Sequence, residues 1–162
     1  MRVVRSPEGP DQFRLYSYLM FTLIQRIDRL RREVYAGDLD LASISEAIAL
    51  SAIEARMRDP QFRDAYRSVA KQAGVAAQRG VNALSVAAAT GIPRETVRRK
   101  IKKLIELGAI VEVKRGEYVM KPGFLQQDSV QERLGQALVD TTRFINDSLD
   151  QGLFQEEERP GS

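Results

Sequence analysis

Residues 81–121 read VNALSVAAATGIPRETVRRKIKKLIELGAIVEVKRGEYVMK, and this stretch has the most specific structural pattern in the chain. Asn82 is a favoured N-cap, so the stretch predicts a short helix that runs from there to Thr90. Gly91 follows and supplies a tight turn, because glycine adopts a positive φ without steric cost. A second helix after such a turn completes a helix-turn-helix pattern.

The second helix is expected over about residues 93–107. Pro93 starts it, since the missing N–H of proline is harmless in the first turn, and Gly108 ends it at the C′ position. Positions 94–103 carry six basic residues and one acid, so the exposed face is strongly basic. The apolar residues at helical spacing predict the buried face: Val97, Ile101, Leu104 and Ile105.

A β-hairpin is expected directly after this helix. Ala109–Val113 and Glu117–Lys121 are two short β-prone runs, and Lys114-Arg115-Gly116 forms the turn between them.

A helix that enters the major groove needs apolar residues on one side as an anchor. On the other side it needs long donors that reach phosphates and base edges.

The stretch resembles the winged helix-turn-helix family of bacterial transcription regulators, including its MarR-like branch. The resemblance covers about residues 60–123 and is carried by Val86-Ala87, Thr90-Gly91-Ile92, Arg94-Glu95-Thr96-Val97 and Leu104-Ile105-Glu106-Leu107-Gly108-Ala109-Ile110. It implies a sequence-specific regulator that binds double-stranded DNA. The helix over 93–107 would enter the major groove, and the wing over 109–121 would contact the backbone or minor groove.

The residues expected to contact DNA lie on the second helix and at the hairpin tip. Arginine bonds guanine in a bidentate way and glutamate can accept from cytosine, whereas phosphate contacts position the helix without reading sequence. The candidates for base edges are Arg94, Glu95, Arg98 and Arg99. The candidates for phosphate contacts are Thr96, Lys102 and Lys103. The candidates at the hairpin tip are Lys114 and Arg115, and Arg115 can enter a minor groove. For each residue alone, a solvated surface charge is the alternative.

The net charge of +3 hides an uneven distribution. Residues 79–121 carry ten basic and four acidic side chains, a net of +6. Residues 122–162 carry three basic and eight acidic side chains, a net of −5, and residues 1–78 are nearly balanced at +2. A basic middle followed by an acidic end points to a polyanionic partner for the middle.

Composition excludes several function classes. The chain of 162 residues has no Cys and no His. This rules out disulfides, thiolate nucleophiles, the Ser-His-Asp triad and imidazole metal sites. Helix capping explains the acidic pair Asp38 and Asp40 better than catalysis does. We therefore expect a protein that is not an enzyme and needs no cofactor.

A long helix is expected from Asp11 to about Tyr35, a stretch without Pro or Gly. Its apolar residues alternate in steps of three and four, which is the a/d repeat of a helix–helix interface. These residues are Phe13, Tyr16, Met20, Leu23, Ile27, Leu30 and Val34. We expect a homodimer that forms through Tyr16, Met20, Leu23, Ile27 and Leu30. An intrachain core helix is the alternative that the same pattern allows.

Long helices at both ends complete a mainly α fold class, a winged helix-turn-helix with a small β-hairpin wing between flanking N-terminal and C-terminal helices. Further helices are expected over Asp40–Arg58, Gln61–Gln78 and Gln126–Leu149, after a loose arm at residues 1–10. The expected organisation is an N-terminal helical region (1–60) for dimerisation or effector binding, a DNA-binding domain (61–123), a C-terminal helix (124–150) and a disordered acidic tail (151–162).

Aromatic side chains concentrate in the N-terminal half, where they can line a pocket for a small-molecule effector or belong to an ordinary core. They are Tyr16, Tyr18, Phe21, Tyr35, Phe62 and Tyr66. The most apolar stretch, Leu15–Ile24, has ten residues, whereas a membrane-spanning helix needs roughly 20. We therefore expect a cytoplasmic protein without a membrane partner.

A second function class fits the same residues. A winged helix can serve instead as a protein–protein interaction or assembly module, in which the basic face docks on an acidic protein. Steep loss of duplex binding with rising salt would favour DNA, because counterions are released on binding. Absence of duplex binding at low salt would favour protein contact.

Overall fold

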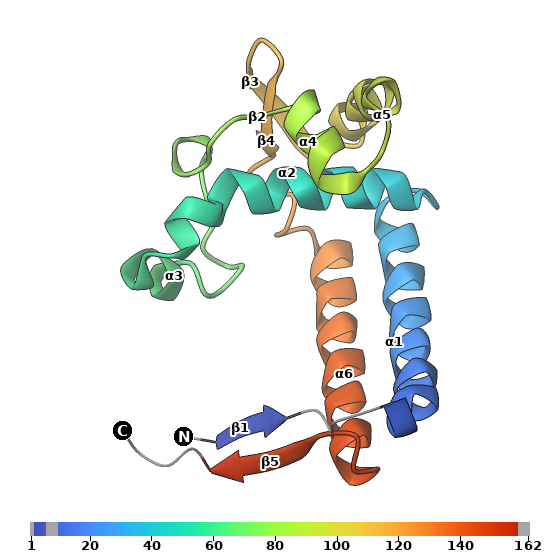
Figure 1. Ribbon diagram of the computed structural model, residues 1–162. Helices are drawn as coiled ribbons and strands as arrows, with labels where there is room; N and C mark the ends of the chain where they lie inside the picture. The colour runs from blue at the N-terminus through green and yellow to red at the C-terminus, as the bar shows by residue number, and fades with distance from the viewer. Residues whose placement is uncertain (1, 6–9, 159–162) are drawn as a thin grey trace. The chain divides into compact units, whose positions relative to one another are not determined.

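The computed structural model describes residues 2–5 and 10–158 (Figure 1). The fold is mainly helical, with two small antiparallel sheets. Its helices are α1 (Phe13–Val34), α2 (Leu39–Met57), α3 (Pro60–Ala65), α4 (Ala83–Thr90), α5 (Arg94–Glu106) and α6 (Asp128–Asp150), with 3-10 helices η1 (Pro10–Gln12) and η2 (Val75–Ala77). Its strands are β1 (Arg2–Arg5), β2 (Val81–Asn82), β3 (Ile110–Lys114), β4 (Glu117–Met120) and β5 (Gln155–Glu158).

Contacts divide the chain into two compact units. The central unit comprises residues 31–132, and the terminal unit comprises the described residues up to 30 and from 133 onward. The expected boundary at residue 60 does not separate these units. The reason is that α2 contacts α4, α5 and β4, so a helix assigned to the N-terminal region belongs to the core beneath α5.

α2 is the central helix of the central unit, with α4, α5 and the β3–β4 hairpin on one side of it (Figure 1). Asp38 starts α2, since its side chain accepts hydrogen bonds from the backbone N–H groups of Asp40 at 3.0 Å and Leu41 at 3.3 Å. Proline at position 60 ends it, because the residue before a proline is disfavoured in the helical region. Ile44 and Ile48 are fully buried and form the middle of the core.

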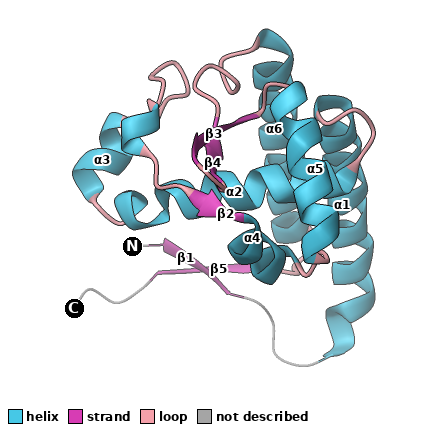
Figure 2. Cartoon of the chain, turned by 90° about the horizontal axis from the view of Figure 1, so that it is seen from above, coloured by secondary structure: helices cyan, strands magenta, loops and turns pink. Residues whose placement is uncertain are grey.

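The expected hairpin is confirmed, and a third strand joins it. Figure 2 shows β2, β3 and β4 together, in the order β2-β4-β3. Ile110 lies opposite Met120, and Val81 of β2 lies opposite Tyr118 on the other edge of β4. The strand β2 has two residues, too few to show an alternating pattern in the sequence.

The helix expected over residues 61–78 is wrong beyond its first turns. α3 ends at Ala65. The rings of Phe62, inside α3, and Tyr66, its C-cap, stack with centroids 4.4 Å apart. The hydroxyl of Ser68 accepts the N–H of Ala70, a local bond that competes with helical hydrogen bonding. The segment then continues as turns to η2 and β2.

The terminal unit contains the two long helices and the pairing of the chain ends. The described parts of α1 and α6 lie side by side and run antiparallel (Figure 1). Both expected long helices are confirmed within a few residues. The loose arm and the disordered tail are wrong for residues 2–5 and 155–158, because β1 and β5 pair antiparallel with Arg5 opposite Gln155. The loose arm is also wrong at residue 10, where η1 begins, and the disordered tail at residues 151–154, where Leu153 is 3% exposed. The remaining positions, 1, 6–9 and 159–162, lie outside the described residues.

Candidate nucleic-acid interface

α4 and α5 are joined by a tight turn that the local sequence determines. The side chain of Asn82 caps α4 by accepting a hydrogen bond from the backbone N–H of Ser85 at 2.9 Å. At the other end Gly91 has a φ of 71°, and its N–H donates to the carbonyl of Ala87 at 2.9 Å. Both expectations for this turn are confirmed, although Pro93 is the N-cap of α5 rather than its first residue.

α5 buries one face and exposes the other. Val97, Ile101 and Leu104 are at most 2% exposed and anchor the helix in the central unit. Ile105, expected on the buried face, is exposed instead. The basic residues expected to contact DNA all lie at exposed positions: Arg94, Arg98, Arg99, Lys102 and Lys103.

The C-terminal end of α5 sets the direction of the hairpin. Gly108 has a φ of 71°, and its N–H donates to the carbonyl of Ile105 at 3.0 Å. The N–H of Ala109 donates to the carbonyl of Leu104 at 3.0 Å. These two bonds are the Schellman pattern, which confirms the expected helix end and leads the chain directly into β3.

Two candidates for base contacts pair with each other on the surface of α5. Nη1 of Arg98 lies 3.2 Å from Oε1 of Glu95, one turn earlier, and both side chains are exposed. Such a pair adds little stability. Both side chains keep further donors or acceptors free to contact a base. Thr96, the candidate for a phosphate contact, is half-buried beside them.

Lys100 is the basic residue of α5 that faces inward. Its Nζ lies 2.5 Å from Oδ2 of Asp38 and 3.2 Å from Oδ2 of Asp40, at the start of α2. The hydrogen bond from Lys100 lowers the pKa of the Asp38 carboxyl below its usual range. Burial alone would lower the pKa of Lys100, but the two carboxylates raise it overall. Asp38 thus caps α2 as expected and also fixes α5 against it.

The hairpin tip is exposed and locally braced. Lys114 and Arg115 are exposed, as the hypothesis of a wing requires. Gly116 has a φ of 77°, and its N–H donates to Oε1 of Glu112 at 2.6 Å. Burial raises the pKa of Tyr118, the nearby Glu112 carboxylate adds to this, and Arg98 opposes it.

An open cleft of about 760 Å³ lies beside β2 and the hairpin. Its polar lining includes Ser51, Glu54, Arg79, Ser85, Lys114 and Glu117. Arg79 was not among the sequence candidates because it precedes the helix-turn-helix pattern. The pairing of β2 with β4 brings Arg79 to the same cleft as Lys114, where Glu54 and Glu117 balance the two cations.

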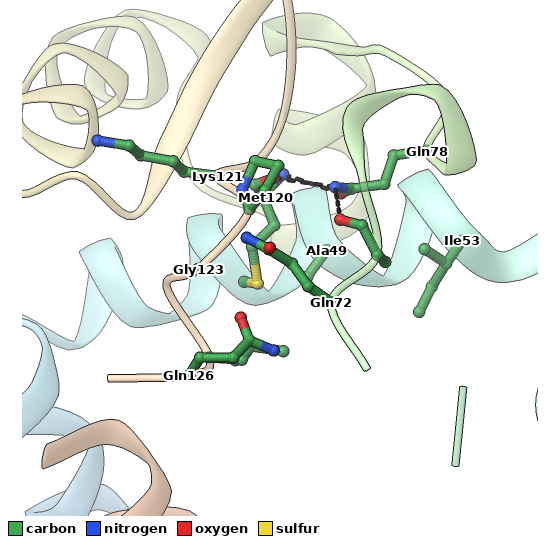
Figure 3. Close-up of a pocket in the computed structure, with 11 residues that line it drawn as sticks. Ala49, Ile53, Gln72, Gln78, Met120, Lys121, Gly123 and Gln126 are labelled. Carbon is green, nitrogen blue, oxygen red and sulfur yellow. Dashed lines mark hydrogen bonds between the residues drawn. The ribbon is translucent and has the colours of Figure 1, made fainter. Parts of the chain in front are cut away.

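A smaller cavity of about 100 Å³ lies where the segment before β2 meets the end of β4 (Figure 3). The side-chain amide of Gln78 imitates a strand there, donating to the carbonyl of Met120 at 3.0 Å and accepting its N–H at 3.1 Å. A side-chain amide of Gln126 donates to the carbonyl of Val69. Ligand pockets usually exceed about 300 Å³, so this cavity is small for an effector.

The six aromatics that suggested an effector pocket do not line that cavity. Tyr35 is buried in the core of the central unit, where its hydroxyl donates to the Ser45 hydroxyl at 3.1 Å. Burial raises its pKa. Phe62 and Tyr66 stack on each other beyond the end of α2. The aromatics of α1 that remain are exposed: Tyr16, Tyr18 and Phe21.

The five residues expected to form a dimer interface fall into two groups on α1. Leu30 is 6% exposed, and Leu23 lines a cavity of about 90 Å³ with Phe144 of α6. Both are therefore engaged within the chain. Tyr16 is exposed, whereas Met20 and Ile27 are half-buried. The structure thus divides the expected interface between an internal and an outward face.

Comparisons with known proteins found no similar protein. No family model matches the chain, and no curated protein and no solved structure matches it either. Within residues 2–5 and 10–158, no three His, Cys, Asp or Glu side chains gather as a metal ion would require. In the same part of the chain, no helix has both the length and the apolar character needed to cross a membrane.

Proposed function

We propose that this chain is a sequence-specific transcription regulator that binds double-stranded DNA through a winged helix-turn-helix and acts as a homodimer. The observation that carries the proposal is the two-faced α5. Three apolar residues anchor one face, while five exposed basic residues and Glu95 occupy the other. The turn at Gly91 and the hairpin after Gly108 support the same interpretation.

In this proposal α5 lies in the major groove. Its 13 residues span about 20 Å, and a helix of ordinary diameter fits a groove about 12 Å wide. Arg94, Arg98 and Arg99 reach base edges, and Glu95 accepts from cytosine. Thr96, Lys102 and Lys103 bond phosphates and set the register.

The hairpin contacts the backbone or the adjacent minor groove. Arg115 at the tip enters the minor groove, and Lys114 contacts a phosphate. Arg79 lines the same cleft as Lys114, but Glu54 and Glu117 line it too, so the proposed basic surface ends at the hairpin tip. A homodimer would present two copies of α5 to half-sites separated by about 34–36 Å, one turn of DNA.

Selection of bound sequences from a random duplex pool tests the proposal. We expect an inverted repeat, because a two-fold dimer reads two equivalent half-sites. Enrichment of no sequence at all would overturn sequence-specific binding, and enrichment of a single unrepeated motif would overturn the homodimer.

Salt dependence separates DNA from an acidic protein as the partner. Binding to duplex should weaken about 10³-fold between about 50 and 200 mM salt if six or so phosphates are neutralised. Measured by fluorescence anisotropy, duplex binding that is undetectable even at about 50 mM salt would favour the protein-contact alternative.

A further inference from the structure

α1 and α6 pack on each other through one face each. Nη1 of Arg26 lies 3.4 Å from Oδ1 of Asp140, whose side chain is 4% exposed. Leu19, Leu23 and Phe144 line the small cavity between the two helices. The inner face of α1 therefore follows residues 19, 23 and 26, and that of α6 follows residues 140 and 144.

Each helix carries a second set of apolar side chains that residues 2–5 and 10–158 leave exposed. Its members recur at spacings of three and eight on α1 and of four and seven on α6, and their side chains are between 41% and 69% exposed. On α1 they are Phe13, Tyr16 and Ile24, and on α6 they are Leu134, Leu138 and Ile145. We call these six residues the outer stripe.

The two halves of the outer stripe point to the same side of the helix pair. Successive residues of an α-helix are rotated by about 100° about its axis. On α1 the outer stripe is rotated by about 100° from the inner face, in the direction of increasing residue number. On α6 the rotation is similar in size and in the same direction. The two helices run antiparallel (Figure 1). Equal rotations in the direction of increasing residue number therefore bring both stripes to one side. The pair therefore presents one continuous apolar surface.

We propose that the outer stripe is the interface with a second copy of this chain, which completes a four-helix bundle of α1, α6 and their two-fold equivalents. This inference rests on the homodimer of the proposed function and assigns its interface to a different face from residues 23 and 30. An antiparallel helix pair with two stripes on one side is half of such a bundle. An identical pair covers it with a closed, isologous contact.

The area of the outer stripe suits a dimer. Six large side chains, about half exposed, present roughly 500–600 Å² of apolar surface. A standard interface buries about 800 Å² on each partner, of which about 65% is apolar in homodimers. The outer stripe therefore supplies the apolar core that one side of a stable dimer requires.

The charge of the surface favours a copy of itself over another partner. Around the outer stripe, α1 positions 13, 16, 17, 20, 24 and 27 and α6 positions 134, 135, 138, 141, 142 and 145 carry no Asp, Glu, Lys or Arg. A charged partner such as DNA or an anionic surface finds no complement there. An uncharged apolar face is complementary to itself, as a two-fold contact requires.

Sedimentation analysis of the full chain and two matched variants tests the inference. Leu138→Lys places a charge in the outer stripe, at a side chain 69% exposed. Leu50→Lys makes the same change on α2, at a side chain 68% exposed. We expect a dimer for the unaltered chain and for Leu50→Lys, and at least about tenfold weaker association for Leu138→Lys.

A variant on the other helix and a folding control complete the design. Ile24→Lys, on α1, should weaken association as Leu138→Lys does, with unchanged helical circular dichroism in both. Association of Leu138→Lys and Ile24→Lys equal to that of the unaltered chain would overturn the assigned face while leaving the homodimer standing. A monomeric unaltered chain would overturn both, and duplex binding measured alongside reports separately on the DNA-binding function.

Discussion

α5 and the α1–α6 pair are both amphipathic, yet their outward faces differ in chemistry. α5 buries Val97, Ile101 and Leu104 inside the chain and turns five basic side chains to solvent. The α1–α6 pair also buries apolar residues such as Leu19, but it turns large apolar side chains such as Phe13 and Leu138 outward as well.

The chemistry of the exposed face of a helix, rather than the periodicity of its apolar residues, therefore indicates the kind of partner. Both regions repeat apolar residues in steps of three and four, which shows only that each is a helix with an apolar side. A basic outward face matches a polyanion, whereas an uncharged apolar face matches another protein surface. The experiments that follow test each side of this contrast.

The largest effect is expected from removing two cations of α5. Arg98→Ala with Arg99→Ala should weaken binding to the selected operator by about 30-fold or more, since each bidentate guanine contact is worth about 1–3 kcal/mol. Fluorescence anisotropy measures the change, and circular dichroism should show an unchanged fold.

A charge-matched variant controls for net charge. Arg58→Ala with Arg63→Ala removes two exposed arginines of the α2–α3 region. It should leave operator affinity within a few-fold, because a change in distant exposed charge is screened by salt. Equal losses in both double variants would show that α5 contributes only overall charge.

The buried side of α5 is tested by Leu104→Ala. Leu104 is fully buried, so we expect a loss of about 2–5 kcal/mol in the free energy of unfolding. Urea denaturation measures it. Leu138→Ala, at an exposed position of the same residue type, should cost far less in a monomeric background, and similar losses at both positions would break the contrast between the two regions.

The path from α4 to the hairpin could be predicted because each boundary has a local cause. Asn82 caps α4, Gly91 and Gly108 take positive φ where the two helices end, and Gly116 does so in the hairpin turn. These signals lie within a few residues of what they determine. The exposed basic face of α5 follows from the same spacing.

The features that the sequence could not show depend on partners far along the chain. Lys100 bonds Asp38 from 62 residues away, so its inward direction has no local signal. The segment before β2 is held through Gln78 to Met120, 42 residues on. β1 and β5 pair the two ends of the chain, where neither strand alone has a helical or alternating pattern. In residues 61–78, the contact of Gln78 with Met120 holds the end of the expected helix in another conformation.

A smaller effect is expected at the contact that aligns α5 with α2. Asp38→Asn keeps an N-cap, since asparagine caps as well as aspartate, but removes the charge that faces Lys100. We expect the free energy of unfolding near neutral pH to fall by about 1 kcal/mol. Lys100→Met, which leaves Asp38 as a cap, should cost a similar amount if the pair is the cause.

The stability lost in Asp38→Asn depends on pH in a definite direction. The pKa of Asp38 is lowered in the folded chain from a usual value of 3.8. Its contribution is therefore complete above pH 3.8 and disappears as pH falls through the lower folded value. In urea denaturation, the free energies of unfolding of the unaltered chain and of Asp38→Asn should converge in strongly acidic buffer. A difference between them that stays constant at every pH would assign the loss to the N-cap rather than to the charge.

The smallest effect is expected at Gly135, beside the outer stripe on α6. A Cβ at this position would meet nothing within 4 Å in the chain, so alanine fits without strain. In the Leu138→Lys background, at a concentration where that variant is monomeric, Gly135→Ala should raise the free energy of unfolding by about 0.5–1 kcal/mol, the helix-propensity difference. Thermal or urea unfolding measures the gain. A loss instead would mean that the backbone at residue 135 is already covered within one chain, and the surface beside the outer stripe would not be open to a second copy.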